Sequence, residues 1–177
     1  MIAALALAAA LGGAGVSTPV QQDDTVAGLV RTACADTGLR REALEATARR
    51  LRWRPVSMTS TRGAAGWVVG YRVGQATVLM SMTPADGVVD PEQASVCSVT
   101  VSRPSADWRS RIEALAADLE LAAEPPFQGP PGVDMLSWSK LGVLTLSAAY
   151  APSNQSLAVS LSRQFVTSTT QTVPSGN

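Results

Sequence analysis

Residues 95–103 read SVCSVTVSR, and residues 155–163 read QSLAVSLSR. In both stretches an apolar residue alternates with a small polar one, which is typical of a β-strand with one buried face. Both stretches also end in Ser-Arg. This near repetition of one strand indicates that the chain contains two copies of a larger structural unit.

The segments around the two strands occur in the same order in each half of the chain. In each half a helix with apolar residues three and four positions apart is followed by two strands and then by the repeated strand. The predicted helices cover residues 39–54 and 105–119, and the predicted strands cover residues 66–72, 76–82, 95–103, 134–140, 143–149 and 155–163. One extra helix, residues 24–35, precedes the first unit.

The two units share few identical residues. Glu42-Ala43-Leu44 aligns with Glu113-Ala114-Leu115, and Gly74 aligns with Gly142. We interpret the pattern as an α-β-β-β internal duplication. The alternative is that a biased composition produces these identities.

The alternating strands predict an α+β fold with an antiparallel sheet of about six strands and helices on one face. Residues 39–54 are basic and residues 105–125 are acidic, so we expect the helices in these two segments to be neighbours of complementary charge. One domain, residues 19–166, accounts for this pattern. Residues 167–177 are polar and lack periodicity, which predicts a disordered tail.

Residues 2–16 form an uncharged run of apolar and small residues. This run has the length of the apolar region of a signal peptide and is too short for a membrane span. We therefore predict a signal peptide over residues 1–18, cleaved between Ala10 and Thr18. No basic residue precedes the run, so an uncleaved interfacial anchor is the alternative, and only then would the protein contact a membrane.

The chain has two cysteines, Cys34 and Cys97. In an exported protein an even number of cysteines predicts a disulfide, here worth about 3–4 kcal/mol through loop entropy. The alternative is a pair of reduced, buried cysteines in a cytosolic protein.

Composition excludes several classes of function. The net charge is zero and the chain has no histidine. Zero net charge argues against nucleic acid as a partner. The lack of histidine excludes Ser-His-Asp and Cys-His nucleophiles and histidine metal sites, so we expect no cofactor and no metal.

The most distinctive charged segment is the run of arginines in and after the helix of residues 39–54. A candidate anion-binding surface would consist of Arg40, Arg41, Arg49, Arg50, Arg52 and Arg54. Arginine clusters bind phosphate and carboxylate groups, and Trp53 could add an aromatic contact. The alternative is an ordinary solvated helix face.

Acidic residues and one lysine supply the other candidates for chemistry. Asp86, Asp90 and Glu92 cluster in one segment, and paired carboxylates can hydrolyse glycosidic bonds. A turn also requires such residues for its geometry. Lys140 is the only lysine and could act with a serine.

Between residues 24 and 166 the segments LVRTACADT, RLRW, SVCSVTV, DWRSRIEALAADL and SLAVSLSRQF follow one another after the export-like segment. This order resembles that of small uncharacterised exported proteins of alphaproteobacteria with two cysteines. The resemblance implies a periplasmic setting and a disulfide, and it implies no activity. Such proteins read Gly-Trp before the first strand, where this chain has Leu51-Arg52-Trp53.

Together these features predict a non-catalytic periplasmic or secreted domain that binds a protein or an envelope component through the open face or edge of its sheet. The alternative is a small envelope hydrolase that uses carboxylates.

Overall fold

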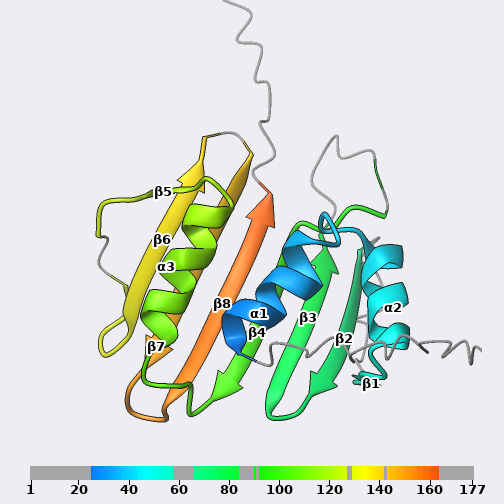
Figure 1. The fold of residues 1–177 in the computed structure, drawn as a ribbon, viewed down its shortest axis with the longest axis horizontal. Helices are drawn as coiled ribbons and strands as arrows, with labels where there is room; N and C mark the ends of the chain where they lie inside the picture. The colour runs from blue at the N-terminus through cyan, green and yellow to red at the C-terminus, as the bar shows by residue number, and fades with distance from the viewer. Residues whose placement is uncertain are drawn as a thin grey trace, which may run out of the picture.

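The computed structural model of the protein describes residues 25–57, 66–83, 90, 92–126, 129–141 and 143–163. These residues form an α+β fold in which helices pack on one open, eight-stranded antiparallel sheet (Figure 1). The helical elements are α1 (Val26–Val30), the π-helical turn η1 (Arg31–Ala35), α2 (Arg41–Arg50) and α3 (Trp108–Asp118). The strands are β1 (Arg54–Pro55), β2 (Trp67–Val73), β3 (Ala76–Met82), β4 (Val96–Ser102), β5 (Ala122–Ala123), β6 (Asp134–Lys140), β7 (Leu144–Ala151) and β8 (Ser156–Arg163).

The six strands predicted from residue alternation are all present, as the six long strands of the sheet. The sheet has eight strands rather than about six because β1 and β5 each add a two-residue strand at an edge. Two residues are too few to show alternation, so β1 and β5 could not be predicted from it.

The order of the elements repeats along the chain and across the sheet. Elements α2-β1-β2-β3-β4 are followed by α3-β5-β6-β7-β8, and the strand order is β1-β2-β3-β4-β8-β7-β6-β5. The repeated strands β4 and β8 are therefore neighbours at the centre. They pair antiparallel, with Val99 opposite Val159, Val96 opposite Ser162 and Ser102 opposite Ser156.

The ends of α2 and α3 have the same geometry. In α2 the N–H of Trp53 donates to Ala48 O at 2.9 Å, and Arg52 between them has a left-handed φ of 57°. In α3 the N–H of Leu121 donates to Ala116 O at 2.9 Å, and Glu120 between them has a left-handed φ of 57°. Both are Schellman-type C-caps in which a non-glycine residue takes the position that glycine prefers.

These caps correct the predicted alignment of the two helices. Because Ala48 is equivalent to Ala116, the buried Leu44 is equivalent to Ile112 and not to Leu115. The Glu-Ala-Leu match is one helical turn out of register and results from composition. The other predicted match to Gly74, at Gly142, lies outside the described residues.

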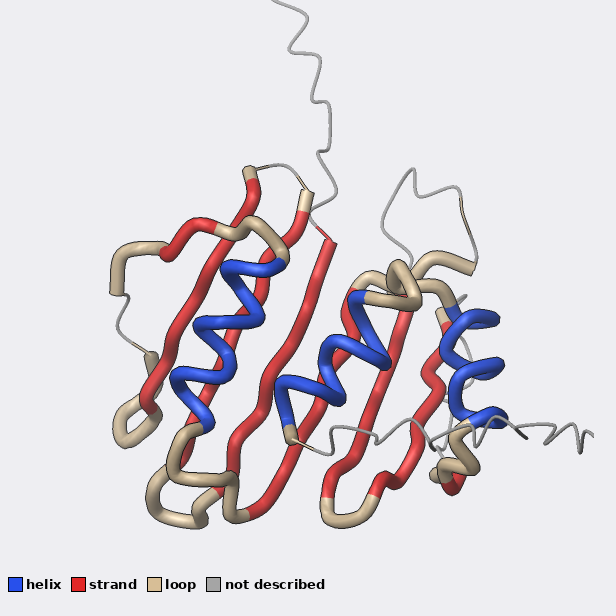
Figure 2. The backbone as a smooth tube through the Cα atoms, viewed as in Figure 1, coloured by secondary structure: helices blue, strands red, loops and turns tan. Residues whose placement is uncertain are grey.

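Helix α1 lies across the centre of the sheet, between α3 and α2 (Figure 2). The predicted contact between the basic and acidic helices is therefore wrong, because α1 separates α2 from α3. The acidic helix pairs instead with η1, through Arg31 and Asp118.

A disulfide joins Cys34 in η1 to Cys97 in β4, with an S–S distance of 2.01 Å. Both cysteines are completely buried. The predicted pairing is confirmed. Of the helical segments in the described residues, the bond fixes the one that belongs to neither repeated unit, α1 with η1, to the centre of the sheet.

One set of alternating strand residues forms the core together with the helices. It includes Val78 and Met80 of β3, Cys97 and Val99 of β4, Leu157, Val159 and Leu161 of β8, and Leu146 and Ala148 of β7. The registers place all of these side chains on the same face of the sheet. None of the helices described is long and apolar enough to cross a membrane.

We expect the disulfide to contribute a large part of the stability. The Cys34→Ala/Cys97→Ala variant should lose about 3–4 kcal/mol of unfolding free energy, because the unfolded chain is no longer cross-linked. Urea denaturation followed by tryptophan fluorescence measures this loss.

The matched control for that variant is the wild-type protein in reductant, whose urea midpoint should fall to a similar value. Equal midpoints for oxidised wild type and the variant would show that the cross-link contributes nothing.

Candidate functional site

The six arginines of the predicted anion-binding surface do not form one cluster. At the start of α2, Arg40 Nη1 lies 3.1 Å from Asp90 Oδ2, and Arg41 Nε lies 2.9 Å from Glu45 Oε1. The hydrogen bond to Glu45 raises the pKa of Arg41 above its usual value. Arg40 and Arg41 are thus neutralised by carboxylates.

Arg49 and Arg50 lie in the last turn of α2 and are exposed. Positive charge there interacts favourably with the carbonyl end of the helix dipole. These two residues therefore have a sufficient structural reason to be basic.

The last two predicted residues, Arg52 and Arg54, join a third arginine that the sequence did not single out. Together with Arg72 of β2 they line a cavity of about 460 Å³ at the sheet edge. We call these three residues the arginine edge. Among the described residues, none of the three has a carboxylate partner.

The pairing of β1 with β2 places Arg54 directly opposite Arg72. Like charges opposite each other across an antiparallel pair destabilise the sheet. Two cations held side by side without a described counter-ion form a surface that favours an anion. Alternation along its strand predicts that Arg72 is on the outward side. Its position beside Arg54 depends on the two-residue strand β1, which alternation does not predict.

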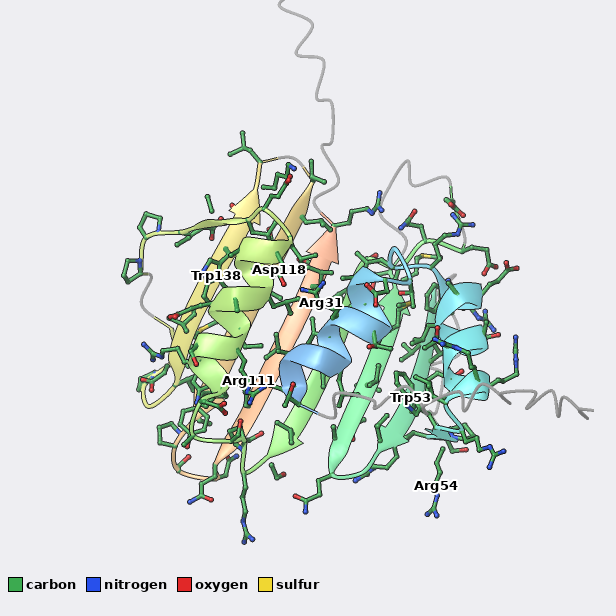
Figure 3. All side chains as sticks on the ribbon, in the orientation of Figure 1. Arg31, Trp53, Arg54, Arg111, Asp118 and Trp138 are labelled. Carbon is green, nitrogen blue, oxygen red and sulfur yellow. A yellow bond between two sulfur atoms is a disulfide. The ribbon has the colours of Figure 1, made fainter. Side chains whose placement is uncertain are left out.

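Trp53 forms part of the wall of the same cavity. Its side chain is only 8% exposed, and its ring centroid lies 6.3 Å from that of Tyr71. The indole Nε1 is buried and has no acceptor in the described part of the chain. In Figure 3, Trp53 lies by the sheet edge while Arg54 projects away from it.

The sheet face opposite the core has an unusual composition. In β3, β4, β8 and β7, the outward residues are partly or fully exposed, and none is charged. We call this set the open face: Thr77, Leu79, Ser81, Val96, Ser98, Thr100, Ser102, Ser156, Ala158, Ser160, Ser162, Thr145, Ser147, Ala149 and Ala151.

Charge on this side of the sheet is found at its two edges. Arg54 and Arg72 lie on one edge, since Arg72 alternates with the core-packed residues of β2. At the other edge Glu124 follows β5, and its N–H donates to Ser137 O at 2.9 Å. Hydrogen bonds from the hydroxyls of Ser139 and Ser137 hold the pKa of Glu124 below the usual 4.5.

The remaining candidates for chemistry are engaged in local contacts. Asp90 pairs with Arg40 through Oδ2 and accepts the N–H of Glu92 through Oδ1. Asp86 lies outside the described residues. Lys140 Nζ lies 2.9 Å from Glu120 Oε2. The carboxylate-dependent hydrolase stays a prediction, and no contact described here favours it.

A second cavity, of about 310 Å³, lies between α1 and α3. The ion pair between Arg31 and Asp118 closes one part of its wall, and Arg111 in the wall pairs with Asp107 at 2.6 Å. Figure 3 shows Arg31, Arg111 and Asp118 along this boundary between the two helices. The charges lining this cavity are mutually satisfied, so it offers less to an ionic ligand than the arginine edge does.

No protein-family model matches the chain, and comparisons with curated proteins and with solved structures find no match. The resemblance to small exported proteins therefore stays a prediction.

Neutralising one arginine at the edge should stabilise the protein. The Arg72→Gln variant removes the repulsion from Arg54, so its unfolding free energy should rise by about 0.2–1 kcal/mol. Urea denaturation of dilute protein at low salt, where the chain is monomeric, measures the change. The Arg72→Lys variant keeps the charge and serves as control. A loss of stability in the Gln variant alone would show that the guanidinium has a stabilising partner.

The two serines beside Glu124 should control its ionisation. In the Ser137→Ala/Ser139→Ala variant the pKa of Glu124 should rise towards 4.5, because the carboxylate loses the hydroxyl donors that favour its charged form. NMR titration of the Glu124 side chain in the variant and in wild type measures this shift. An unchanged pKa would show that Glu124 does not contact these hydroxyls.

Proposed function

We propose that the protein is a non-catalytic domain of the periplasm or the extracellular space that binds a partner through the open face of its sheet. In this proposal residues 1–18 are a signal peptide and residues 19–166 are the binding domain. The composition of the open face is the observation that carries the proposal.

Depletion of charged residues is one feature of the centre of a protein interface; enrichment in aromatic residues, which this face lacks, is another. Lysine, arginine, aspartate and glutamate are normally the most exposed residue types. Across β3, β4, β8 and β7 the outward positions carry none of them. Apart from Leu79 and Val96 the same side chains are Ser, Thr or Ala, so a partner could approach the backbone closely over most of the face.

The face supports this role better than the edges of the sheet do. A partner that adds a strand needs a long, unpaired edge. Here β1 and β5 form the two edges and contain two residues each. Such short strands leave few free backbone groups, which is a common protection against edge-to-edge pairing.

The disulfide supports an oxidising compartment, because cytosolic thiols are normally kept reduced.

We also infer that the two units arose by duplication. The support is the repeated order of elements, the matching helix caps and the pairing of β4 with β8 about a common centre.

Site-specific photo-cross-linking tests the proposed binding surface. A photoreactive amino acid at Ser160, in the middle of the open face, should give a discrete adduct in intact cells of the native host. The same amino acid at Ala46, on the exposed side of α2, serves as control and should give none. Absence of adducts from Ser160, or equal adducts from both positions, would contradict the proposal.

A further inference from the structure

We propose that the partner of the open face is a second copy of this chain, packed face to face about a two-fold axis that runs parallel to the strands. This inference rests on the proposed function, because it names the occupant of the same surface. Three properties of the face support it: its extent, its small uncharged side chains and the opposite charges at its two edges.

The outward side of the whole sheet, which consists of the open face together with β2, β6 and the two charged edges, is large enough for a stable dimer. Six long strands about 4.8 Å apart, each about seven residues long at about 3.3 Å per residue, cover roughly 29 by 23 Å. Each copy would then bury about 650 Å², or about 1,300 Å² in total, which lies within the range of specific protein interfaces.

The centre of the face is complementary to itself. Ser98 of β4 lies opposite Ser160 of β8, and Thr100 lies opposite Ala158. Small side chains without charge can meet identical side chains at close distance with neither steric conflict nor repulsion. Packing of two such sheets with their strands nearly aligned is the common arrangement of a β-sandwich.

Two face-to-face arrangements with two-fold symmetry keep the strands aligned. A two-fold axis in the interface plane can run across the strands or along them. An axis across the strands would place the β1 edge of one copy over the β1 edge of the other. Each edge would then face an edge of the same charge, positive over positive on one side and negative over negative on the other, which opposes association.

An axis along the strands places the β1 edge of each copy over the β5 edge of the other. The strand registers place Arg54 and Arg72 level with Met135, and Glu124 level with Ser137. The two arginines then lie about two residues, or roughly 6.6 Å, along the strands from Glu124 of the second copy, within reach of an arginine side chain, twice in each dimer.

Glu124 lies opposite Ser137 of β6, next to the pair of Ala123 with the inward Trp138, so it is on the open side of the sheet. The arrangement supplies the arginine edge with an anion from the same sequence, and it requires no further ligand.

Reversal of the charges tests both the dimer and its axis. The acidic variant is Arg54→Glu/Arg72→Glu, and the basic variant is Glu124→Arg. Each should dimerise more weakly than wild type, by about tenfold at low salt, because like charges meet at both edges. Mixed in equal amounts, the two should recover most of the affinity as a heterodimer. Sedimentation of the full chain, with one variant fluorescently labelled, measures this.

Two further variants separate a folding defect from loss of the interface. The Ser160→Arg variant places a charge at the centre of the face and should be monomeric, with the same unfolding midpoint as wild type when both are measured in dilute solution where wild type is also monomeric. The Ala46→Arg variant carries the same residue on the exposed side of α2 and should dimerise like wild type.

A monomeric wild-type chain at about 100 μM would overturn the proposal, as would a dimer that Ser160→Arg leaves intact. Weakened single variants that do not recover on mixing would exclude the axis along the strands. Adducts from Ser160 to the segment 164–177 of the same chain would also overturn self-association. Adducts to a different envelope component would also overturn self-association, but they would agree with the proposed binding function.

Discussion

The antiparallel pairing of β4 with β8 is the contact on which the whole architecture depends. It joins the last strand of each repeated unit, and it makes two four-stranded sheets into one continuous sheet. Without it each unit would expose a long central strand edge, which is a site of aggregation. The same pairing places Val99 opposite Val159 and fills the middle of the core.

The helical segment formed by α1 and η1 stabilises this junction on the helix-covered face of the sheet. Helix α1 and η1 lie over the central strands, and the bond from Cys34 to Cys97 attaches them to β4. Each unit supplies a single longer helix, α2 or α3, near its own edge of the sheet, so the two units alone would leave the centre uncovered. This explains why only the first copy of the repeated strand contains a cysteine: the second copy has no extra helix to hold.

Much of the fold could be predicted from the sequence because its signals are local. The six long strands alternate clearly, and Trp108 and Ile112 begin a regular helical stripe. Two features could not be predicted. The strands β1 and β5 depend on pairing with distant segments, and the position of α1 depends on packing. The position of Arg72 beside Arg54 depends on β1, so it could not be predicted either. Arg40 and Arg41 belong to the predicted anion-binding surface, but in the structure they pair with Asp90 and Glu45.

The differences between the two units carry more functional information than their likeness does. Their structurally equivalent caps hold Arg52 in one unit and Glu120 in the other, and Glu120 is already paired with Lys140. The edges of the open face likewise differ in sign, with Arg54 and Arg72 at one side and Glu124 at the other. A duplicated fold with equal edges would allow a second sheet to dock in either direction. Opposite edges make one direction favourable, because close charge pairs mainly control orientation and partner choice rather than raw affinity. In the proposed dimer the uncharged centre of the face would provide the contact area, and the charged edges would determine the orientation of the second copy.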